Sequence, residues 1–180
     1  MPRLFTALEI PSSVSRGLSG LRGGLAGAHW IEPENYHITL CFIGDVDGRM
    51  ADEIASALNA VRRAPFQLTV EGVACLGAQR QRSVVAVVEE SDKLMELQDE
   101  QERLLRRLGL ELEGRHYIPH VTLARLRQVP SEDIAGYLTT QGGFAPVSFK
   151  ASRFVLFSSR ASSGGGPYVV EAAYELKKGR

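Results

Sequence analysis

The sequence predicts an α+β fold of two pseudo-symmetric lobes, each with an antiparallel-rich sheet and helices, and an active cleft between the lobes. Three observations lead to this prediction. The tetrad His-x-Thr-Leu occurs twice, at residues 37–40 and 120–123, and two of the four histidines open it. Strand-like and helix-like segments alternate over 180 residues, a length that fits one domain over residues 1–180. Hydrophobic residues make up 44% of the chain and charged residues 23%, as is typical of globular proteins.

The first half of the chain is predicted to hold four strands and two helices. Hydrophobic patterning bounded by turn residues predicts strands at 3–10, 36–44, 66–76 and 82–90, the last two forming a hairpin. Val14, Leu18, Leu21 and Leu25 recur at helical spacing and predict a helix within residues 12–27, which Pro11 can open. Asp47 is the predicted N-cap of a second helix, whose apolar face consists of Met50, Ile54, Leu58 and Val61.

The second half begins with the clearest helix. Ser91 is its predicted N-cap and Gly109 ends it, and the residues of its buried stripe are Leu94, Leu97, Gln101, Leu104 and Leu108. A strand at 117–126, a helix at 131–140 and strands at 147–160 and 167–176 are predicted to follow. The glycine-rich stretch at 161–166 predicts a flexible loop between the last two strands.

The repeated tetrads lie inside strands, where residues two apart share one face. His37 and Thr39 therefore share a face, and the residues predicted to point to the core are Ile38, Leu40 and Phe42. In the second copy His120 and Thr122 share a face, opposite Val121 and Leu123. If a pseudo-twofold axis relates the lobes, the cleft holds two imidazoles and two hydroxyls around one centre.

Two facing histidines suit acid–base chemistry near neutral pH. A neutral imidazole accepts a proton from the attacking group and an imidazolium donates one to the leaving group, and each transfer contributes about 10²–10⁴-fold. The neighbouring hydroxyls can donate to phosphate oxygens, so the arrangement suits in-line displacement at phosphorus.

Two other interpretations of these residues stay open. A single copy would fit a core histidine bonded to a neighbouring threonine, whereas the duplication favours a shared site. Cys41 shares the nominal face of His37, which allows a zinc site, but the matching position in the second copy is Ala124 and no third ligand has suitable spacing. We therefore expect no metal and no cofactor. His29 and His116 have no partner two residues on and are interpreted as structural or surface residues.

Charge and composition limit the possible partners. The net charge is zero, which argues against a nonspecific nucleic-acid binder. Residues 114–180 nevertheless carry nine Lys or Arg against four Asp or Glu, which permits a local site for an anion. The chain contains no apolar run of about 18 residues and no CxxC pair, so we expect a cytoplasmic protein with reduced cysteines. We also expect a monomer.

The sequence resembles the two-histidine phosphoesterase superfamily, and within it the RNA 2′,3′-cyclic phosphodiesterases, also called the 2′-5′ RNA ligase family. The segments that carry the resemblance are "RLFTALEIP", "PENYHITLCFIGDV", "PHVTLAR" and "FVLFSSRASSGGGPY". The resemblance implies a bilobed fold and hydrolysis of an RNA 2′,3′-cyclic phosphate to a 2′-phosphomonoester without metal. Reverse 2′-5′ ligation belongs to the same expectation.

The resemblance also implies roles for individual residues. His37 matches the acid that protonates the departing 3′ oxygen, and His120 matches the base that activates water. Thr39 and Thr122 match the hydroxyls that hold the phosphate, and Arg125 matches an arginine that contacts it. Strict alternation would place Arg125 on the core face, so this role requires the strand to twist or end there, and a surface ion pair is its alternative.

Substrate preference is less well defined by the sequence. Ala86 stands where many relatives carry a tryptophan, and "GVACLG" lacks the Phe-Pro of many members. Phe5, Tyr36 and Tyr168 are candidates to stack on a base, although filling of the core is the favoured interpretation of each. The alternative functions are a phosphodiesterase for 2′-5′ oligonucleotides or small cyclic nucleotides, and a module that binds RNA 3′ ends without turnover.

Overall fold

The structure of the protein is a computed structural model that describes residues 1–78, 81–159 and 166–178. Within these residues the chain forms nine strands, four α-helices and two short 3₁₀ helices. The strands are β1 (Arg3–Glu9), β2 (Ala28–Trp30), β3 (His37–Asp45), β4 (Phe66–Ala78), β5 (Gln81–Val88), β6 (His120–Leu126), β7 (Val147–Ala151), β8 (Arg153–Ser159) and β9 (Tyr168–Glu175). The helices are α1 (Ser12–Ser19), η1 (Pro33–Asn35), α2 (Gly48–Ala57), η2 (Leu58–Ala60), α3 (Asp92–Arg107) and α4 (Ser131–Thr140). The predicted α+β class is confirmed.

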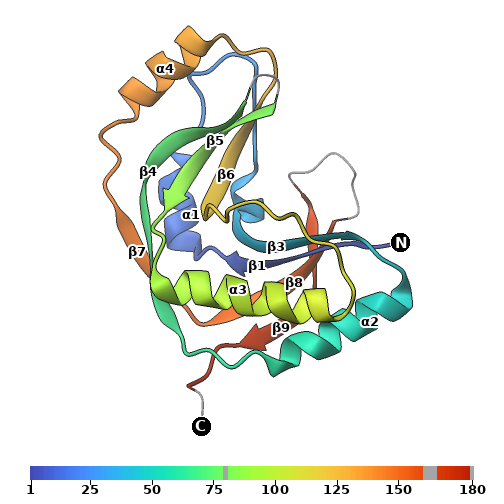
Figure 1. Ribbon diagram of the computed structural model, residues 1–180. Coiled ribbons are helices and arrows are strands. Elements are labelled where there is room, and N and C mark those ends of the chain that lie inside the picture. The colour runs from blue at the N-terminus through green and yellow to red at the C-terminus, as the bar shows by residue number, and fades with distance from the viewer. Residues whose placement is uncertain (79–80, 160–165, 179–180) are drawn as a thin grey trace.

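All nine strands belong to one antiparallel sheet with the order β7-β4-β5-β6-β3-β1-β8-β9, and β2 pairs with β6 beside this path. We call β3, β1, β8 and β9 lobe 1, and β6, β5, β4, β7 and β2 lobe 2. Among the described residues, β3 and β6 are paired only at Ile38 and Val121, so the sheet is narrowly joined where the lobes meet. Figure 1 shows β4, β5 and β6 rising away from the strands of lobe 1.

Each lobe combines strands from both halves of the sequence. The C-terminal hairpin β8–β9 pairs with β1, and β7 pairs with β4. The lobes are therefore not successive halves of the chain, although each contains one of the two histidine motifs. This exchange joins the halves into a main hydrophobic core, to which both lobes contribute buried residues.

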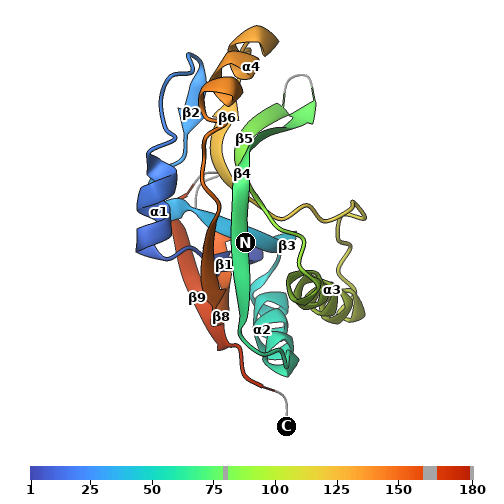
Figure 2. The ribbon, with the colours of Figure 1, turned by 90° about the vertical axis from the view of Figure 1, so that its left-hand side faces the viewer.

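The predicted helix caps are confirmed. Asp47 Oδ1 accepts a hydrogen bond from the backbone N–H of Met50 at 2.8 Å and begins α2. Ser91 Oγ accepts from the N–H of Leu94 at 3.3 Å and begins α3. The helices α2 and α3 lie side by side in both views (Figures 1 and 2). No helix among the described residues is both apolar and long enough to span a membrane.

Two predicted segments differ from the structure. Helix α1 ends at Ser19, and three glycines that follow it have positive φ, namely Gly23, Gly24 and Gly27. Leu21 and Leu25 are nevertheless buried. The strand predicted at 147–160 is two strands, β7 and β8, which pair with different neighbours. The short strand β2 was not predicted. Most of the predicted loop at 161–166 lies outside the described residues.

Candidate active site

A β-bulge sets the direction of the side chains at the end of the second motif. The pairing of β6 with β5 skips Leu123, between Thr122 and Ala124. The extra residue reverses the alternation of faces beyond it. Ala124 is therefore buried, and Arg125 is exposed on the face that carries His120 and Thr122. The bulge removes the conflict between strand alternation and a phosphate-binding role for Arg125.

The first motif contains the same irregularity. The pairing of β3 with β1 skips Leu40, between Thr39 and Cys41. Beyond this bulge Cys41 is buried and Phe42 is 52% exposed. The prediction that Phe42 points to the core is therefore wrong, as is the placement of Cys41 on the face of His37. Phe42 occupies the position in the first motif that Arg125 occupies in the second.

Both histidines are held by the same backbone contact. His37 Nδ1 lies 2.9 Å from the carbonyl oxygen of Asn35, and His120 Nδ1 lies 2.7 Å from that of Ile118. A carbonyl can only accept, so in each ring Nδ1–H is the donor and the neutral imidazole leaves Nε2 unprotonated. His37 Nε2 lies 3.0 Å from Thr39 Oγ1. In both motifs the backbone therefore binds Nδ1, and Nε2 is left to interact with other groups, the Thr39 hydroxyl in the case of His37.

The electrostatic environment of His37 includes two other predicted site residues, His120 and Arg125. Burial lowers the pKa of His37 below its usual 6.5, the hydrogen bond to Asn35 opposes this effect, and the charges of His120 and Arg125 lower it further. Two residues of lobe 2 thus act on a histidine of lobe 1. In the protein without substrate, these effects favour the neutral form of His37.

An aromatic cluster surrounds the His37 ring on the face opposite the main core. The ring centroids of Phe5, Phe157 and Tyr168 lie 5.1, 6.0 and 5.0 Å from that of His37. Phe5 and Phe157 are buried in a small apolar cluster of their own. Tyr36 is buried in the main core, as the favoured interpretation predicted. The aromatic side chains around His37 exclude water from one side of the ring and explain its lowered pKa.

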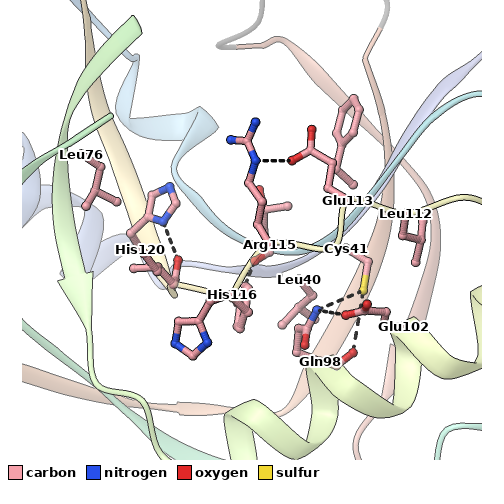
Figure 3. A pocket seen from close by; sticks show the side chains of 14 residues that line it. Leu40, Cys41, Leu76, Gln98, Glu102, Leu112, Glu113, Arg115, His116 and His120 are labelled. Atoms are coloured by element: carbon pink, nitrogen blue, oxygen red, sulfur yellow. Dashed lines mark hydrogen bonds and ion pairs between the residues drawn. The ribbon is translucent and has the colours of Figure 1, made fainter. Parts of the chain in front are cut away.

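A cavity of about 310 Å³ lies next to the motifs, between β3, α3 and the segment before β6. Figure 3 shows His120 and Leu76 on one side of this cavity and Cys41, Gln98 and Glu102 on the other. Its polar rim includes an ion pair in which Arg115 Nε lies 3.6 Å from Glu113 Oε2 (Figure 3). The cavity therefore combines apolar walls with groups that can donate to or accept from a ligand.

Two residues of this cavity were missed by the sequence analysis. Phe42, which is 52% exposed, and Tyr117 both line the cavity, and the Tyr117 hydroxyl donates to the Thr39 carbonyl at 2.8 Å. Comparison of the fifth position after each histidine would have matched Phe42 with Arg125. Nothing in the sequence indicated the role of Tyr117, because its hydrogen-bond partner is a backbone atom of a strand that is distant in the sequence.

The remaining histidines and Arg125 can now be placed. His29 is exposed on β2, directly opposite Arg125 in the register of β6. His116 is exposed, with Nε2 3.5 Å from Glu90 Oε1. The interpretation as a surface residue fits His29, whereas His116 is exposed and also lines the cavity (Figure 3). Within the described residues Arg125 forms no ion pair with a carboxylate, which disfavours the alternative of a surface salt bridge.

The zinc alternative finds little support in the geometry. Cys41 Sγ contacts the Gln98 carbonyl oxygen at 3.8 Å, and burial raises the pKa of the thiol to about 12, which disfavours the thiolate that zinc binds. In the described parts of the chain, no three His, Cys, Asp or Glu side chains form a group that could hold a metal ion.

Known proteins share both the sequence and the fold. The family model described as LigT like Phosphoesterase matches residues 8–87 and 85–168, and each span contains one His-x-Thr motif. A protein of Thermotoga maritima named RNA 2′,3′-cyclic phosphodiesterase is 32% identical over 175 residues, which cover 93% of this chain and 92% of that protein. A protein of the same name from Aeropyrum pernix is 38% identical over 152 residues, 82% of this chain and 84% of its own.

A solved structure gives the same result for the fold. The crystal structure of E. coli LigT complexed with 3′-AMP superposes with a TM-score of 0.77, at 20% identity, over 99% of this chain and 100% of that one. The similarity in fold covers both lobes. The chain therefore belongs to the LigT-like phosphoesterase family.

Proposed function

We propose that this protein is an RNA 2′,3′-cyclic 3′-phosphodiesterase that hydrolyses the cyclic phosphate at an RNA terminus to a 2′-phosphomonoester without a metal. The observation that carries the proposal is the pair of histidines, one in each lobe, in which a backbone carbonyl binds Nδ1 and leaves Nε2 as the nitrogen for proton transfer. Relatives that match most of the chain bear the name of this activity.

In the proposed mechanism the two histidines transfer protons on opposite sides of phosphorus. His120 Nε2 accepts a proton from a water molecule while the oxygen of that water forms a bond to phosphorus. The bond from phosphorus to the 3′ oxygen breaks, and His37 Nε2 donates the proton that this oxygen acquires. His37 must therefore be protonated when substrate is bound. An anionic cyclic phosphate beside it raises its pKa, opposing the effects that lower it in the free protein.

The remaining site residues hold the phosphate. Thr39 and Thr122 are half-buried beside the histidines and can donate hydroxyl hydrogens to nonbridging oxygens. Arg125, exposed on the same face, can contact two phosphate oxygens at once through its guanidinium. These groups stabilise the charge that develops on phosphorus while the histidines move the protons.

The cavity beside the motifs supports a nucleotide as the ligand. Its volume of about 310 Å³ lies within the range of about 300–1,000 Å³ typical of small-molecule sites. Phe42 offers an exposed ring on which a base can stack, and any base has a face that can do so. We therefore propose that the nucleoside next to the cyclic phosphate lies in this cavity.

The proposal extends to the whole chain, as one bilobed unit over residues 1–180 that acts as a monomer in the cytoplasm. The single sheet shared by both lobes and the free thiols of Cys41 and Cys75 support this view. With a 5′-hydroxyl in place of water as the attacking group, the same proton transfers join that hydroxyl to phosphorus and release the 3′ oxygen, so 2′-5′ ligation is included in the proposal.

The test is incubation of the protein with a nucleoside 2′,3′-cyclic phosphate in the presence of EDTA, with products followed by ³¹P NMR. We expect a 2′-phosphomonoester and no 3′-phosphomonoester. Unchanged substrate supports a module that binds without turnover, and activity that depends on added zinc supports a metal site. Parallel reactions with cyclic-phosphate oligonucleotides and 2′-5′ oligonucleotides rank the substrate classes.

A further inference from the structure

Tyr117 connects the two histidine motifs. It lies three residues before His120, in the segment that leads into β6 of lobe 2. Its hydroxyl donates a hydrogen bond of 2.8 Å to the backbone carbonyl of Thr39, which belongs to β3 of lobe 1. The next residue, Ile118, accepts the 2.7 Å hydrogen bond from His120 Nδ1. Two hydrogen bonds therefore connect the backbone of the first motif to the imidazole of the second.

This connection matters because the backbone pairing between the lobes is narrow at this point. The strands β3 and β6 are paired only at Ile38 and Val121 among the described residues, so no continuous ladder fixes Thr39 relative to His120. Burial raises the pKa of the Tyr117 hydroxyl above its usual 10, so the group remains a donor throughout the neutral range.

We infer that Tyr117 is a positioning residue for the proposed hydrolysis, on which the inference rests. By holding its segment against Thr39, it places the Ile118 carbonyl where this oxygen fixes the His120 ring and its tautomer. A ring fixed with Nδ1–H bonded to Ile118 presents an unprotonated Nε2 to the attacking water. Without the Tyr117 hydroxyl, the segment can shift, and a smaller fraction of molecules presents His120 in the reactive orientation.

The test compares Tyr117→Phe with a matched control, Tyr174→Phe. Each substitution removes one hydroxyl that donates at 2.8 Å to a backbone carbonyl, Thr39 in one case and Ala55 of α2 in the other. For Tyr117→Phe we expect kcat to fall about 3- to 10-fold while KM for a nucleoside 2′,3′-cyclic phosphate changes less than about twofold. For Tyr174→Phe we expect kcat within about twofold of the wild-type value.

Nitrogen-15 NMR of the His120 ring gives a readout that does not depend on turnover. At a pH where the ring is neutral, we expect one tautomer, protonated at Nδ1, in the wild type and in Tyr174→Phe, and a mixture in Tyr117→Phe. An unchanged tautomer in Tyr117→Phe, or equal kcat in the two variants, overturns the inference. A raised KM at constant kcat also overturns it, because that result assigns Tyr117 to substrate contact. A wild-type protein without hydrolytic activity refutes the proposed function instead, and the NMR comparison still decides whether Tyr117 orients His120.

Discussion

Replacement of Arg125 by alanine tests the consequence of the β-bulge in β6. The bulge at Leu123 turns Arg125 toward the face of His120 and Thr122, where it is exposed. A hydrogen bond to a charged group contributes about 1.5–3 kcal/mol, so Arg125→Ala should lower kcat/KM for the cyclic phosphate about 10- to 150-fold. Steady-state kinetics on a nucleoside 2′,3′-cyclic phosphate measure this effect.

The same substitution should move the pH dependence of the reaction. Burial is the main reason for the low pKa of His37, and the charges of His120 and Arg125 add to it. Without the guanidinium, the pKa of His37 rises, and the limb of the pH profile governed by this group shifts to higher pH. Arg125→Lys keeps the positive charge and therefore the position of the limb, but it loses the two-pronged contact to phosphate and most of the efficiency.

Arg127→Ala is the control, because Arg127 is an exposed arginine just beyond the end of β6. It should leave efficiency within about twofold of the wild-type value, since substitutions away from such contacts change free energies by about 0.5 kcal/mol or less. If Arg125→Ala also retains wild-type efficiency and an unshifted limb, Arg125 does not reach the phosphate, and the role inferred from the bulge is refuted.

Three further outcomes follow from the site. Thr39→Ala or Thr122→Ala should lower kcat/KM about 10- to 150-fold, and serine at either position should retain most of the wild-type efficiency. Equal losses for alanine and serine would show that the hydroxyl is not the cause of the loss. Phe42→Ala should raise KM about tenfold with little change in kcat. The control is Val170→Ala, at an exposed residue of β9, which should leave KM unchanged. Equal KM values for the two variants would contradict stacking of a base on Phe42. His37 has a lower pKa in the folded protein than its usual 6.5, so the unfolded chain binds protons more readily and stability falls as pH drops below about 6.5. Urea unfolding between about pH 5 and 8 should show that the free energy of unfolding falls less steeply with decreasing pH in His37→Gln than in the wild type. The same pH dependence in both proteins would contradict the burial assigned to His37.

The sequence predicted the elements of this fold better than their connections. Alternation and helical periodicity located the strands and helices, and Asp47 and Ser91 were identified as caps because a side-chain oxygen there satisfies a free backbone N–H. The exchange of strands between halves could not be predicted. Pairing of β8 with β1 depends on contacts between residues about 150 positions apart, and no local pattern reports them.

The candidate site was predicted as a set of residues but not as a geometry. In each motif the histidine and the threonine precede the bulge of their own strand, where strict alternation holds. The shared faces of His37 with Thr39 and of His120 with Thr122 were therefore predicted from spacing alone. Beyond each bulge strict alternation fails. For this reason Phe42 was wrongly assigned to the core, and the direction predicted for Arg125 conflicted with a phosphate-binding role. A bulge depends on the pairing partner, which a single strand sequence does not contain.

The central claim is that His37 and His120 each transfer one proton, and hydrolysis by the single alanine variants tests it most directly. The measurement is release of 2′-phosphate from a nucleoside 2′,3′-cyclic phosphate in EDTA by wild type, His37→Ala, His120→Ala and, as a matched control, His29→Ala, all shown to be folded by circular dichroism. Loss of one acid or base should lower kcat at least about 10²-fold in each motif variant, while His29→Ala retains wild-type turnover. Turnover near the wild-type rate in folded His37→Ala or His120→Ala would contradict the paired-histidine mechanism.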